Sequence, residues 1–445
     1  MIEGFLIAVG TFVPMLLLLV VVHEWGHFVT AKAYGVKVLE FGIGYPPKAW
    51  GFYAGKTTVL IDQNTQFVNL SGLSDLRDGQ LLRVSSTEDT NGNLVARIIE
   101  APQRGSKPKG PQSLQELGSD EYLNHAGKVR QVSGNSIILA DMLYSLNWIP
   151  LGGFVKLAGE SNPAVPRSLA SKGVFPRAVV LAAGSFMNAL LPIVFFTILF
   201  MLPHDVPIGD TGDVTISAVA AGSAAEDAGI QLEDIIIRAD GRIIQRTTEL
   251  SQAVQLSRGS QMDWLITRDG LQKVIEVTPK LNDSEDRWLA GVGIKLENIP
   301  VERRSEPPWT AVGMAFTNTW EILVLLKEEV SSWISGDKSP ELAGPIGIAR
   351  LTGDVTKEMG LQGWLVLAVL FSINLAILNI LPIPMLDGGR LLFVAIEWVR
   401  GGKRVAPEKE GLVHLIGFVV LIGLIVLISA NDISQAIQGK SPLGG

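Results

Sequence analysis

The sequence predicts a polytopic α-helical membrane protein that also carries soluble, β-rich parts. The chain has 445 residues, of which 47% are hydrophobic and only 18% are charged. This balance is too apolar for an ordinary soluble enzyme and is typical of membrane proteins. Four apolar stretches each approach the roughly 20 residues that a bilayer requires. Between them, segments that alternate polar and apolar residues indicate strands.

Charge and cysteine content narrow the classes of function. The net charge is −7, which argues against a general nucleic-acid binder. The chain has no cysteine, so disulfide frameworks, thiolate zinc sites and cysteine nucleophiles are excluded. It has only five histidines, and any histidine-based metal site therefore has few possible compositions.

The first apolar stretch, residues 5–22, is predicted to be a retained membrane helix. Only Glu3 precedes it and no small-residue cleavage site follows it, which disfavours a signal peptide. The regions expected in chain order are a first transmembrane helix at 1–36, a β segment at 37–54, an inserted β-rich domain at 55–146, a β segment and loop at 147–173, a second transmembrane helix at 174–203, an α/β domain at 205–298, an amphipathic helix and a following segment at 308–358, a third transmembrane helix at 361–398 and a fourth at 412–430.

Basic residues near the ends of the spans set the expected orientation, because short cytoplasmic loops are rich in Lys and Arg. Such residues follow the first span, precede the second and fill the link between the third and fourth. The N-terminus before the first span has none, and the tail has only Lys440. Both termini and the 205–298 domain are therefore expected outside, and loops 32–173 and 385–411 in the cytoplasm.

The inserted domain is expected to form a small β-barrel. Its runs alternate polar and apolar residues, and Asn91-Gly92 is a strong hairpin signal. A Pro-, Gly- and Lys-rich stretch near 101–120 is expected to be a flexible linker. No residue of the domain carries recognisable chemistry, and His125 is expected to be isolated. Further along the chain, the amphipathic helix from residue 308 is expected on the membrane surface.

A His-Glu-x-x-His pattern, formed by His23, Glu24 and His27, directly follows the first apolar stretch. On a helix, positions i and i+4 face the same way, so both imidazoles can reach one zinc ion while the glutamate acts on its water. The alternative is two histidines on a soluble helix face. Position disfavours it, because a charged residue at the centre of a span costs roughly 2.5–3.5 kcal/mol on insertion scales. Three ionisable residues at the end of a span therefore indicate a functional site.

The candidate third metal ligand is Asp387. A catalytic zinc site uses three protein ligands and one open position, and Asp387 ends the third apolar span on the side predicted for His23 and His27. Pro382 and Pro384 are expected to break the helix there, which a membrane tolerates only where the freed backbone is buried or lines a cavity. The alternative is that Asp387 belongs to a cytoplasmic turn that closes the span. The shared depth of the three residues favours ligation.

Two intramembrane amides and a Gly-rich segment are further candidates. Asn188 in the second span and Asn379 in the third either hold helices together or hydrogen-bond a developing oxyanion or an unwound substrate backbone. Strand-like segments flank the inserted domain, and the second of them contains Gly152, Gly153 and Phe154. These segments either pair with a substrate strand beside the site or pack as loops on the membrane face.

Together these residues resemble the site-2 protease family, and most closely its bacterial regulator-of-sigma-E type. The 205–298 domain resembles a PDZ domain. The matching motifs occur in the family's order and cover almost the whole chain outside the inserted domain: HEWGH, IPLGGFVKL, AAGSFMN, GPIGIA and LNILPIPMLDGGRLLF.

The resemblance implies an intramembrane metalloprotease with one Zn²⁺ per chain, held by His23, His27 and Asp387, with Glu24 as the general base. Its substrates would be single-span membrane proteins already trimmed by another protease, such as anti-sigma factors or signal-peptide remnants. The enzyme would lie in the bacterial inner membrane, with its active site near the cytoplasmic face. The PDZ-like domain would exclude uncleaved substrates or bind an exposed peptide C-terminus.

For the remaining candidates, the resemblance implies roles in substrate binding. Asn188 would lie near the oxyanion and Asn379 near the substrate. Gly152, Gly153 and Phe154 would belong to a membrane-reentrant β structure that receives the substrate strand.

Three features depart from the family pattern. Arg390 stands where many relatives have His, which puts a proton or substrate role at that position in doubt. The chain has one PDZ-like domain rather than a tandem pair, and short members lack the inserted domain. Two rival functions are a catalytically inactive membrane adaptor that holds partners through its PDZ-like domain and a zinc carrier or channel. The complete set of ligands and base disfavours the adaptor, and the single ionisable cluster within the spans disfavours transport.

Overall fold

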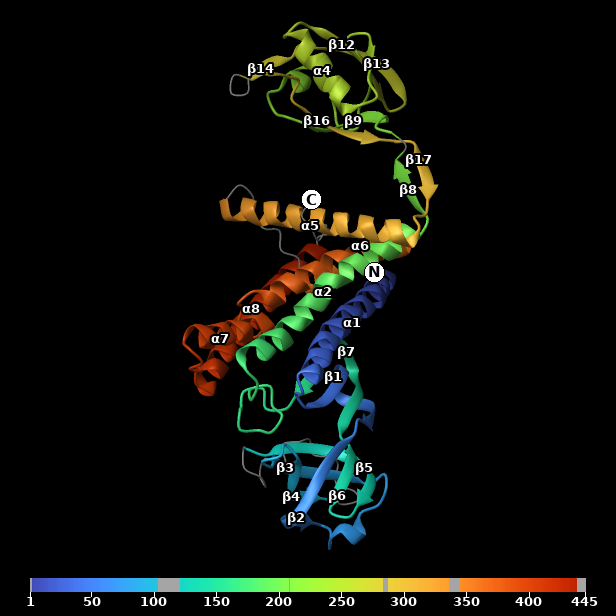
Figure 1. Ribbon diagram of the computed structural model, residues 1–445. Coiled ribbons are helices and arrows are strands. Elements are labelled where there is room, and N and C mark those ends of the chain that lie inside the picture. The colour runs from blue at the N-terminus through green and yellow to red at the C-terminus, as the bar shows by residue number, and fades with distance from the viewer. Residues whose placement is uncertain (1, 103–120, 208, 283–286, 336–343, 438–445) are drawn as a thin grey trace. The chain divides into compact units, whose positions relative to one another are not determined.

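The computed structural model describes residues 2–102, 121–207, 209–282, 287–335 and 344–437. Nearly all of the linker expected near 101–120 lies outside these residues. The chain forms two compact units, one of Met1–Leu199 with Pro308–Gly445 and the other of Phe200–Pro307 (Figure 1).

Four helices among the described residues are long and apolar enough to cross a membrane. They are α1 (Ile2–Ala33), α2 (Val174–Met201), α6 (Pro345–Ile380) and α8 (Pro407–Ile437). Helix α1 packs against α6, where the Trp364 indole N–H donates to the Thr11 carbonyl over 3.0 Å. Gly26 of α1 approaches α2 so closely that a Cβ would collide with the Ala183 carbonyl. The predicted polytopic α-helical membrane protein is confirmed.

The third membrane helix begins earlier than the predicted residue 361. Helix α6 starts at Pro345, inside the GPIGIA segment that was expected to precede the span. The reason is a cap from α8: the buried Asp432 carboxylate accepts hydrogen bonds from the N–H groups of Gly344 (3.2 Å) and Gly347 (2.8 Å). These bonds satisfy donors that a helix N-terminus otherwise leaves free. The chain departs from helical geometry once inside α6, at Gly360 (φ 60°).

The same helix also ends earlier than the predicted residue 398. Helix α6 stops at Ile380, and a separate helix, α7 (Asp387–Val399), carries the LDGG motif at its start. Pro382 and Pro384 explain the break, because proline has no N–H to donate within a helix and its ring clashes with the preceding turn. The helix expected near the membrane surface is α5 (Pro308–Ser335), and its Trp309 and Trp320 side chains are exposed.

Strands β1 (Val38–Ala54) and β7 (Met142–Leu157) form an antiparallel sheet that packs against α1. Because both strands fold over, the sheet has four segments, in the order 153–157, 38–43, 143–146 and 50–54. Residues 153–157 therefore form one edge of this sheet. The β7 strand begins at Met142, so the inserted domain ends before that residue rather than at the expected 146.

The inserted domain is a closed barrel, which confirms the expected β structure. Its strands pair in the order β2-β4-β3-β5-β6. Val59, Leu82, Leu94 and Ile137 are fully buried in its core. The elements are β2 (Thr57–Val68), the short 3₁₀ helix η1 (Leu73–Asp75), β3 (Leu81–Glu88), β4 (Leu94–Glu100), β5 (Leu123–Ser133) and β6 (Ser136–Ala140).

A buried polar cluster joins the barrel to the β1–β7 sheet. The Asp141 carboxylate, 1% exposed, lies 2.7 Å from Lys37 Nζ and 2.8 Å from His125 Nδ1, and it accepts a hydrogen bond from Thr57. The expectation that His125 is isolated was wrong, because strand pairing brings these distant residues together. Burial by itself raises the pKa of Asp141, but the hydrogen bonds and charges of His125 and Lys37 outweigh it and lower that pKa to about 2.

The second unit is an α/β domain whose bounds, Phe200–Pro307, are wider than the expected 205–298. Its sheet order is β13-β12-β10-β9-β16, with β11 beside β10, and Trp264 is fully buried in the core. The elements are β8 (His204–Pro207), β9 (Asp213–Val219), α3 (Ala224–Ala228), β10 (Ile235–Ala239), β11 (Arg242–Ile243), α4 (Thr247–Ser257), β12 (Met262–Arg268), β13 (Leu271–Val277), β14 (Lys280–Asn282), β15 (Arg287–Leu289), β16 (Val292–Glu297) and β17 (Val301–Arg304), the last of which pairs with β8.

Candidate metal centre and active site

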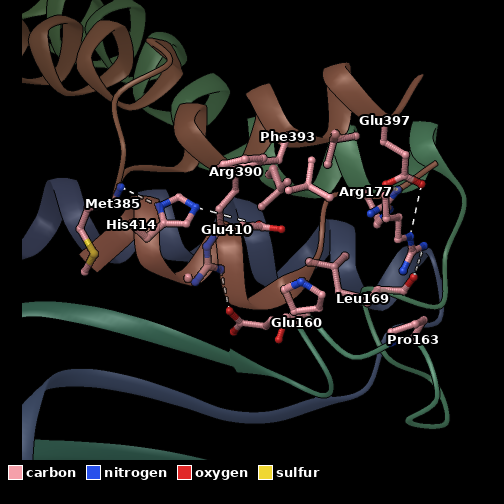
Figure 2. A pocket seen from close by; sticks show the side chains of 18 residues that line it. Glu160, Pro163, Leu169, Arg177, Met385, Arg390, Phe393, Glu397, Glu410 and His414 are labelled. Carbon is pink, nitrogen blue, oxygen red and sulfur yellow. Dashed lines mark hydrogen bonds and ion pairs between the residues drawn. The ribbon is translucent and has the colours of Figure 1, made fainter. Parts of the chain in front are cut away.

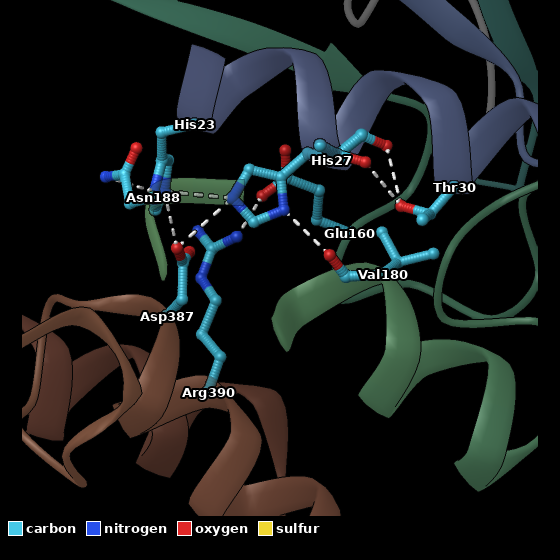
Figure 3. A network of polar contacts seen from close by, with 9 residues as sticks. His23, His27, Thr30, Glu160, Val180, Asn188, Asp387 and Arg390 are labelled. Carbon is cyan, nitrogen blue, oxygen red and sulfur yellow. Dashed lines mark hydrogen bonds and ion pairs between the residues drawn. The ribbon is translucent and has the colours of Figure 1, made fainter. Parts of the chain in front are cut away.

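The His-Glu-x-x-His residues lie on the last third of α1. His23 and His27 are buried, 8% and 9% exposed, and their rings meet edge to face with centroids 4.8 Å apart. Their Nε2 atoms are 3.1 Å apart. The one-turn spacing therefore brings two nitrogen donors to one point (Figure 3).

Asp387, the first residue of α7, lies 364 residues beyond His23 in the sequence and points to the same place. Its Oδ2 atom lies 2.9 Å from Nε2 of His23 and 3.1 Å from Nε2 of His27. The break after α6 makes this approach possible, because it turns the chain so that a new helix starts at Asp387. Among the described residues, these three side chains form the group of His, Asp and Glu ligands whose atoms converge closely enough to hold a metal ion.

Helix α2 supports the two histidines from the side. The Nδ1–H of His27 donates to the Val180 carbonyl over 2.7 Å, which leaves Nε2 without a proton and free to bind a metal. Nδ2 of Asn188 lies 3.4 Å from Nδ1 of His23. Asn188 is 1% exposed, and its Oδ1 atom has no hydrogen-bond partner among the described residues.

Gly184 provides the space into which the imidazoles fit. A Cβ built on Gly184 would lie 2.5 Å from Nε2 of His23 and 2.5 Å from Nε2 of His27. A side chain at this position would therefore occupy the volume directly beside both donor atoms. Gly184 and Asn188 are four residues apart on α2, so one face of that helix both makes room for the cluster and contacts it.

Glu24 is half-buried and contacts the β1–β7 sheet. The Val155 backbone N–H hydrogen-bonds its carboxylate, and the position of a Cβ on Gly153 would be 3.6 Å from its Cγ. The glutamate thus lies between the donor cluster and the sheet edge formed by residues 153–157. A general base in a metalloprotease requires a position that borders both a metal-bound water and the peptide bond to be cut.

Of the other residues predicted to bind substrate, the described contacts bring only Gly153 next to a residue of the His-Glu-x-x-His motif. Gly153 is next to Glu24, while Gly152 (φ 113°) and Phe154 pack against Tyr45 of β1. Asn379 is half-buried on the last turn of α6. Within the described part of the chain, no polar contact joins Asn379 to the donor cluster.

Arg390, which departs from the family pattern, forms an ion pair with an acidic partner close to the ligands. Its Nη1 donates to Glu160 Oε2 over 2.6 Å, from α7 to the loop that follows β7. Figure 3 shows this pair beside Asp387.

The donor set fits a zinc ion. Ligands about 2.0–2.1 Å from zinc in a tetrahedron are ~3.3 Å apart, close to the 2.9–3.1 Å that separate the three donor atoms. Two imidazole nitrogens and one carboxylate oxygen leave a fourth position open, which is the pattern of catalytic rather than structural zinc sites. The side-chain amide of Asn188, whose Nδ2 lies 3.4 Å from Nδ1 of His23, is a polar partner for the outer nitrogen of that ligand.

Sequence reasoning missed the supporting residues. The Val180 carbonyl is a backbone group and has no sequence signal. Gly184 did have a sequence signal, because it lies four residues before Asn188. This spacing places both residues on the helix face that contacts the histidines. His414 of α8, which donates no ligand, accepts a hydrogen bond from Met385 beside Asp387 and had no motif to mark it.

Spanning helices and a buried His-Glu-x-x-His centre define a membrane-embedded metallopeptidase. The family model described as Peptidase family M50 matches residues 11–78 and 128–424 of the chain. The chain therefore belongs to peptidase family M50, and it is a site-2 type zinc metalloprotease.

Several curated proteins are similar over nearly the full chain. Zinc metalloprotease RasP of Oceanobacillus iheyensis is 30% identical over 96% of this chain and 99% of its own. Regulator of sigma-W protease RasP of Bacillus subtilis is 30% identical over 97% of this chain and 98% of its own. Protease RseP of Yersinia pestis is 26% identical over 96% of this chain and 98% of its own. Among solved structures, the PDZ domain of an SdrC-like protein from Listeria monocytogenes is 16% identical and covers 20% of this chain and 93% of its own, with a TM-score of 0.18.

Proposed function

We propose that this protease binds one zinc ion through His23, His27 and Asp387 and cleaves peptide bonds within the membrane-spanning segments of other proteins. The observation that carries the proposal is the convergence of these three donor atoms, 2.9–3.1 Å apart, at the end of an apolar helix long enough to cross a bilayer. A metal-dependent centre at such a place acts on backbone that is itself within or beside the membrane.

A zinc ion held here would act as a Lewis acid that polarises the scissile carbonyl and lowers the pKa of a water molecule. The protein's own residues orient the donors. Val180 fixes the His27 ring, and Gly184 keeps the space beside both Nε2 atoms clear of a side chain.

Glu24 is assigned the proton transfers. Its carboxylate accepts a proton from the attacking water and later gives it to the nitrogen of the leaving amine. The breaking bond is the C–N bond of the peptide, and the new bond joins the water oxygen to the carbonyl carbon. The position of Glu24 between the donor cluster and residues 153–157 supports this role.

The sheet edge at residues 153–157 is assigned to substrate binding. A transmembrane helix must unwind before a protease can reach its carbonyls, and an exposed sheet edge offers the unwound backbone hydrogen-bond partners. Gly152, Gly153 and Phe154 lie on or next to this edge. A strand added here would run alongside Glu24, which supports the assignment. Asn379, on the last turn of α6, is assigned a position near the substrate.

Asn188 is assigned to the outer nitrogen of His23 rather than to the oxyanion. A rotation of its amide by 180° brings the orphaned Oδ1 to Nδ1 of His23, where it accepts that ring's proton and leaves Nε2 free for the metal. The oxyanion role implied by the family resemblance stays as the alternative.

The names of the relatives and the basic residues near the spans support a proposal for the substrate class and the location. We infer single-span substrates trimmed by another protease, of the anti-sigma-factor or signal-peptide class, and a place in the bacterial inner membrane. Both termini and the PDZ-like Phe200–Pro307 unit would lie outside, with the zinc centre near the cytoplasmic face. The PDZ-like unit would sort substrates by size or hold a peptide C-terminus. Because the chain belongs to a family of peptidases, the alternative function of an inactive adaptor is disfavoured.

Cleavage by the purified, reconstituted chain tests the proposal. A single-span substrate is incubated in proteoliposomes with the enzyme as prepared, after treatment with a zinc chelator, and after re-addition of Zn²⁺. The proposal predicts a cut that mass spectrometry maps within the spanning segment, abolished by the chelator and restored by zinc. Cleavage that persists without zinc, or that maps only to the soluble flanks, would overturn it.

A further inference from the structure

Helix α8 is the least buried of the membrane-length helices. Among the described residues, its most apolar stretch has none of its residues buried, whereas the corresponding shares in α2 and α6 are 56% and 44%. It is nevertheless joined to the rest of the bundle by polar contacts near both ends. Asp432 caps α6 near one end, and His414 contacts the chain beside Asp387 near the other.

The contact of His414 is with the backbone of the metal-ligand loop. Nδ1 of His414 accepts a hydrogen bond from the Met385 N–H over 2.8 Å. Met385 lies two residues before Asp387. Figure 2 shows His414 between this N–H group and the Glu410 carboxylate, on the wall of a cavity of about 430 Å³ that Met385 and Arg390 also line.

The backbone that His414 holds is in an unfavourable conformation. Met385 has φ of 80°, in the left-handed region that residues with a side chain rarely adopt. Such a conformation persists only where the surroundings determine it. Pro382 and Pro384, which both precede Met385, have no N–H to donate. The N–H of Ile383 between them donates to the Leu381 carbonyl. The Met385 N–H is the donor that the turn gives to α8.

A second contact on the same face of α8 supports the first. Gly417 follows His414 by three residues, and a Cβ at Gly417 would collide with Pro384. Residues three apart lie on one helix face. The turn before Asp387 is therefore seated on one turn of α8, by shape at Gly417 and by a hydrogen bond at His414.

We propose that His414 is a positioning residue for the metal centre: it fixes the strained Met385 turn and so sets the direction in which Asp387 points. The inference rests on the proposed ligand role of Asp387. Glu410, whose Oε1 atom is 4.0 Å from Nε2 of His414, favours a proton on Nε2, which leaves Nδ1 as the acceptor that the Met385 N–H requires.

Zinc affinity of the full-length chain in detergent, measured by competition with a chromophoric chelator, tests the role. His414→Leu removes the acceptor and should weaken zinc binding roughly 10–100-fold, the usual cost of losing support behind a ligand. His414→Asn places a carbonyl oxygen close to the position of Nδ1 and should restore most of the affinity. Asp432→Asn is the matched control, because it loosens α8 at its other end without touching the turn, and it should bind zinc as the wild type does.

The outcomes separate this inference from the function on which it rests. If the wild type binds zinc and His414→Leu binds it equally well, His414 does not position the centre. The same conclusion follows if Asp432→Asn weakens zinc binding as much as His414→Leu does. It also follows if His414→Asn binds zinc no more tightly than His414→Leu. A wild type that binds no zinc would overturn the proposed function itself, and the role of His414 with it.

Discussion

Gly184 of α2 lies so close to His23 of α1 that a Cβ at position 184 would come within 2.5 Å of the His23 Nε2 atom. The same Cβ would come equally close to Nε2 of His27. These are the two nitrogens that converge with Asp387. The absence of a side chain at Gly184 therefore leaves room for a metal ion beside the two histidines of α1.

Gly184→Ala should abolish zinc binding or displace the ion from the productive geometry. A methyl group at that position pushes the imidazoles away, and a displacement of about 1 Å costs on the order of 100-fold in rate. Cleavage of a single-span substrate and zinc content check this outcome. Gly10→Ala on α1 is the control, because nothing lies within 4 Å of its Cβ position. Normal zinc content and activity in Gly184→Ala would contradict the geometry described above.

Asn188 variants distinguish support of His23 from stabilisation of the oxyanion. Asn188→Leu should weaken zinc binding by roughly 10–100-fold if the amide holds the His23 ring. Asn188→Asp should retain zinc, because a carboxylate accepts the Nδ1 proton equally well. Chelator competition gives the affinities, and steady-state kinetics with saturating zinc give kcat. An Asn188→Leu variant with unchanged zinc affinity and a low kcat would favour the oxyanion role instead.

The sheet edge at residues 153–157 should contact the substrate. Because the chain has no cysteine, single cysteines can be introduced without removing others. Lys156→Cys, on that edge, should form a disulfide with a cysteine in the substrate's spanning segment. Trp50→Cys is the control on the opposite edge of the same sheet, and it should form none. Equal cross-linking at both positions would argue against strand pairing at residues 153–157.

Asp141→Asn should destabilise the barrel. The substitution leaves the Lys37 charge buried without its partner, which costs roughly 3–5 kcal/mol. Hydrogen exchange of the β5 amides in the full-length chain measures the loss, and the exposed Asp78→Asn should change it by less than about 0.5 kcal/mol.

The pH dependence of the barrel provides a second check on Asp141. Its pKa is lowered in the folded state to about 2, so the ionised carboxylate stabilises the fold above the unfolded pKa of about 3.9. This contribution decreases as the pH falls from about 4 toward 2. The difference between wild type and Asp141→Asn should therefore shrink over that interval. A difference independent of pH would show that the charge of Asp141 is not the cause.

Short sequence patterns were enough to predict the histidine pair, the four membrane spans and the helix break before Asp387. The one-turn spacing of His23 and His27 fixes their common face on any helix, and the length of the apolar stretches was enough to expect four spans. The family expected from the motifs is confirmed. Pro382 and Pro384 predicted the break before Asp387, although not that a new helix would begin there.

What the sequence did not reveal depends on contacts between distant segments. The cluster around Asp141 joins residues from four separate strands or strand ends, and no short motif encodes it. The start of α6 depends on Asp432, which lies 85 residues beyond Gly347. The folding of β1 against two parts of β7 is likewise a matter of register, which alternation of residue types leaves undetermined.

The zinc content of Glu24→Gln, measured alongside its cleavage of a single-span substrate, tests the central claim most directly. The account predicts that the variant keeps its zinc, because Glu24 is not a ligand, and that cleavage falls by at least about 100-fold, because the proton transfers lose their carrier. Cleavage at the wild-type rate by Glu24→Gln, or loss of zinc from it, would contradict the assignment of Glu24 as the base beside a centre of His23, His27 and Asp387.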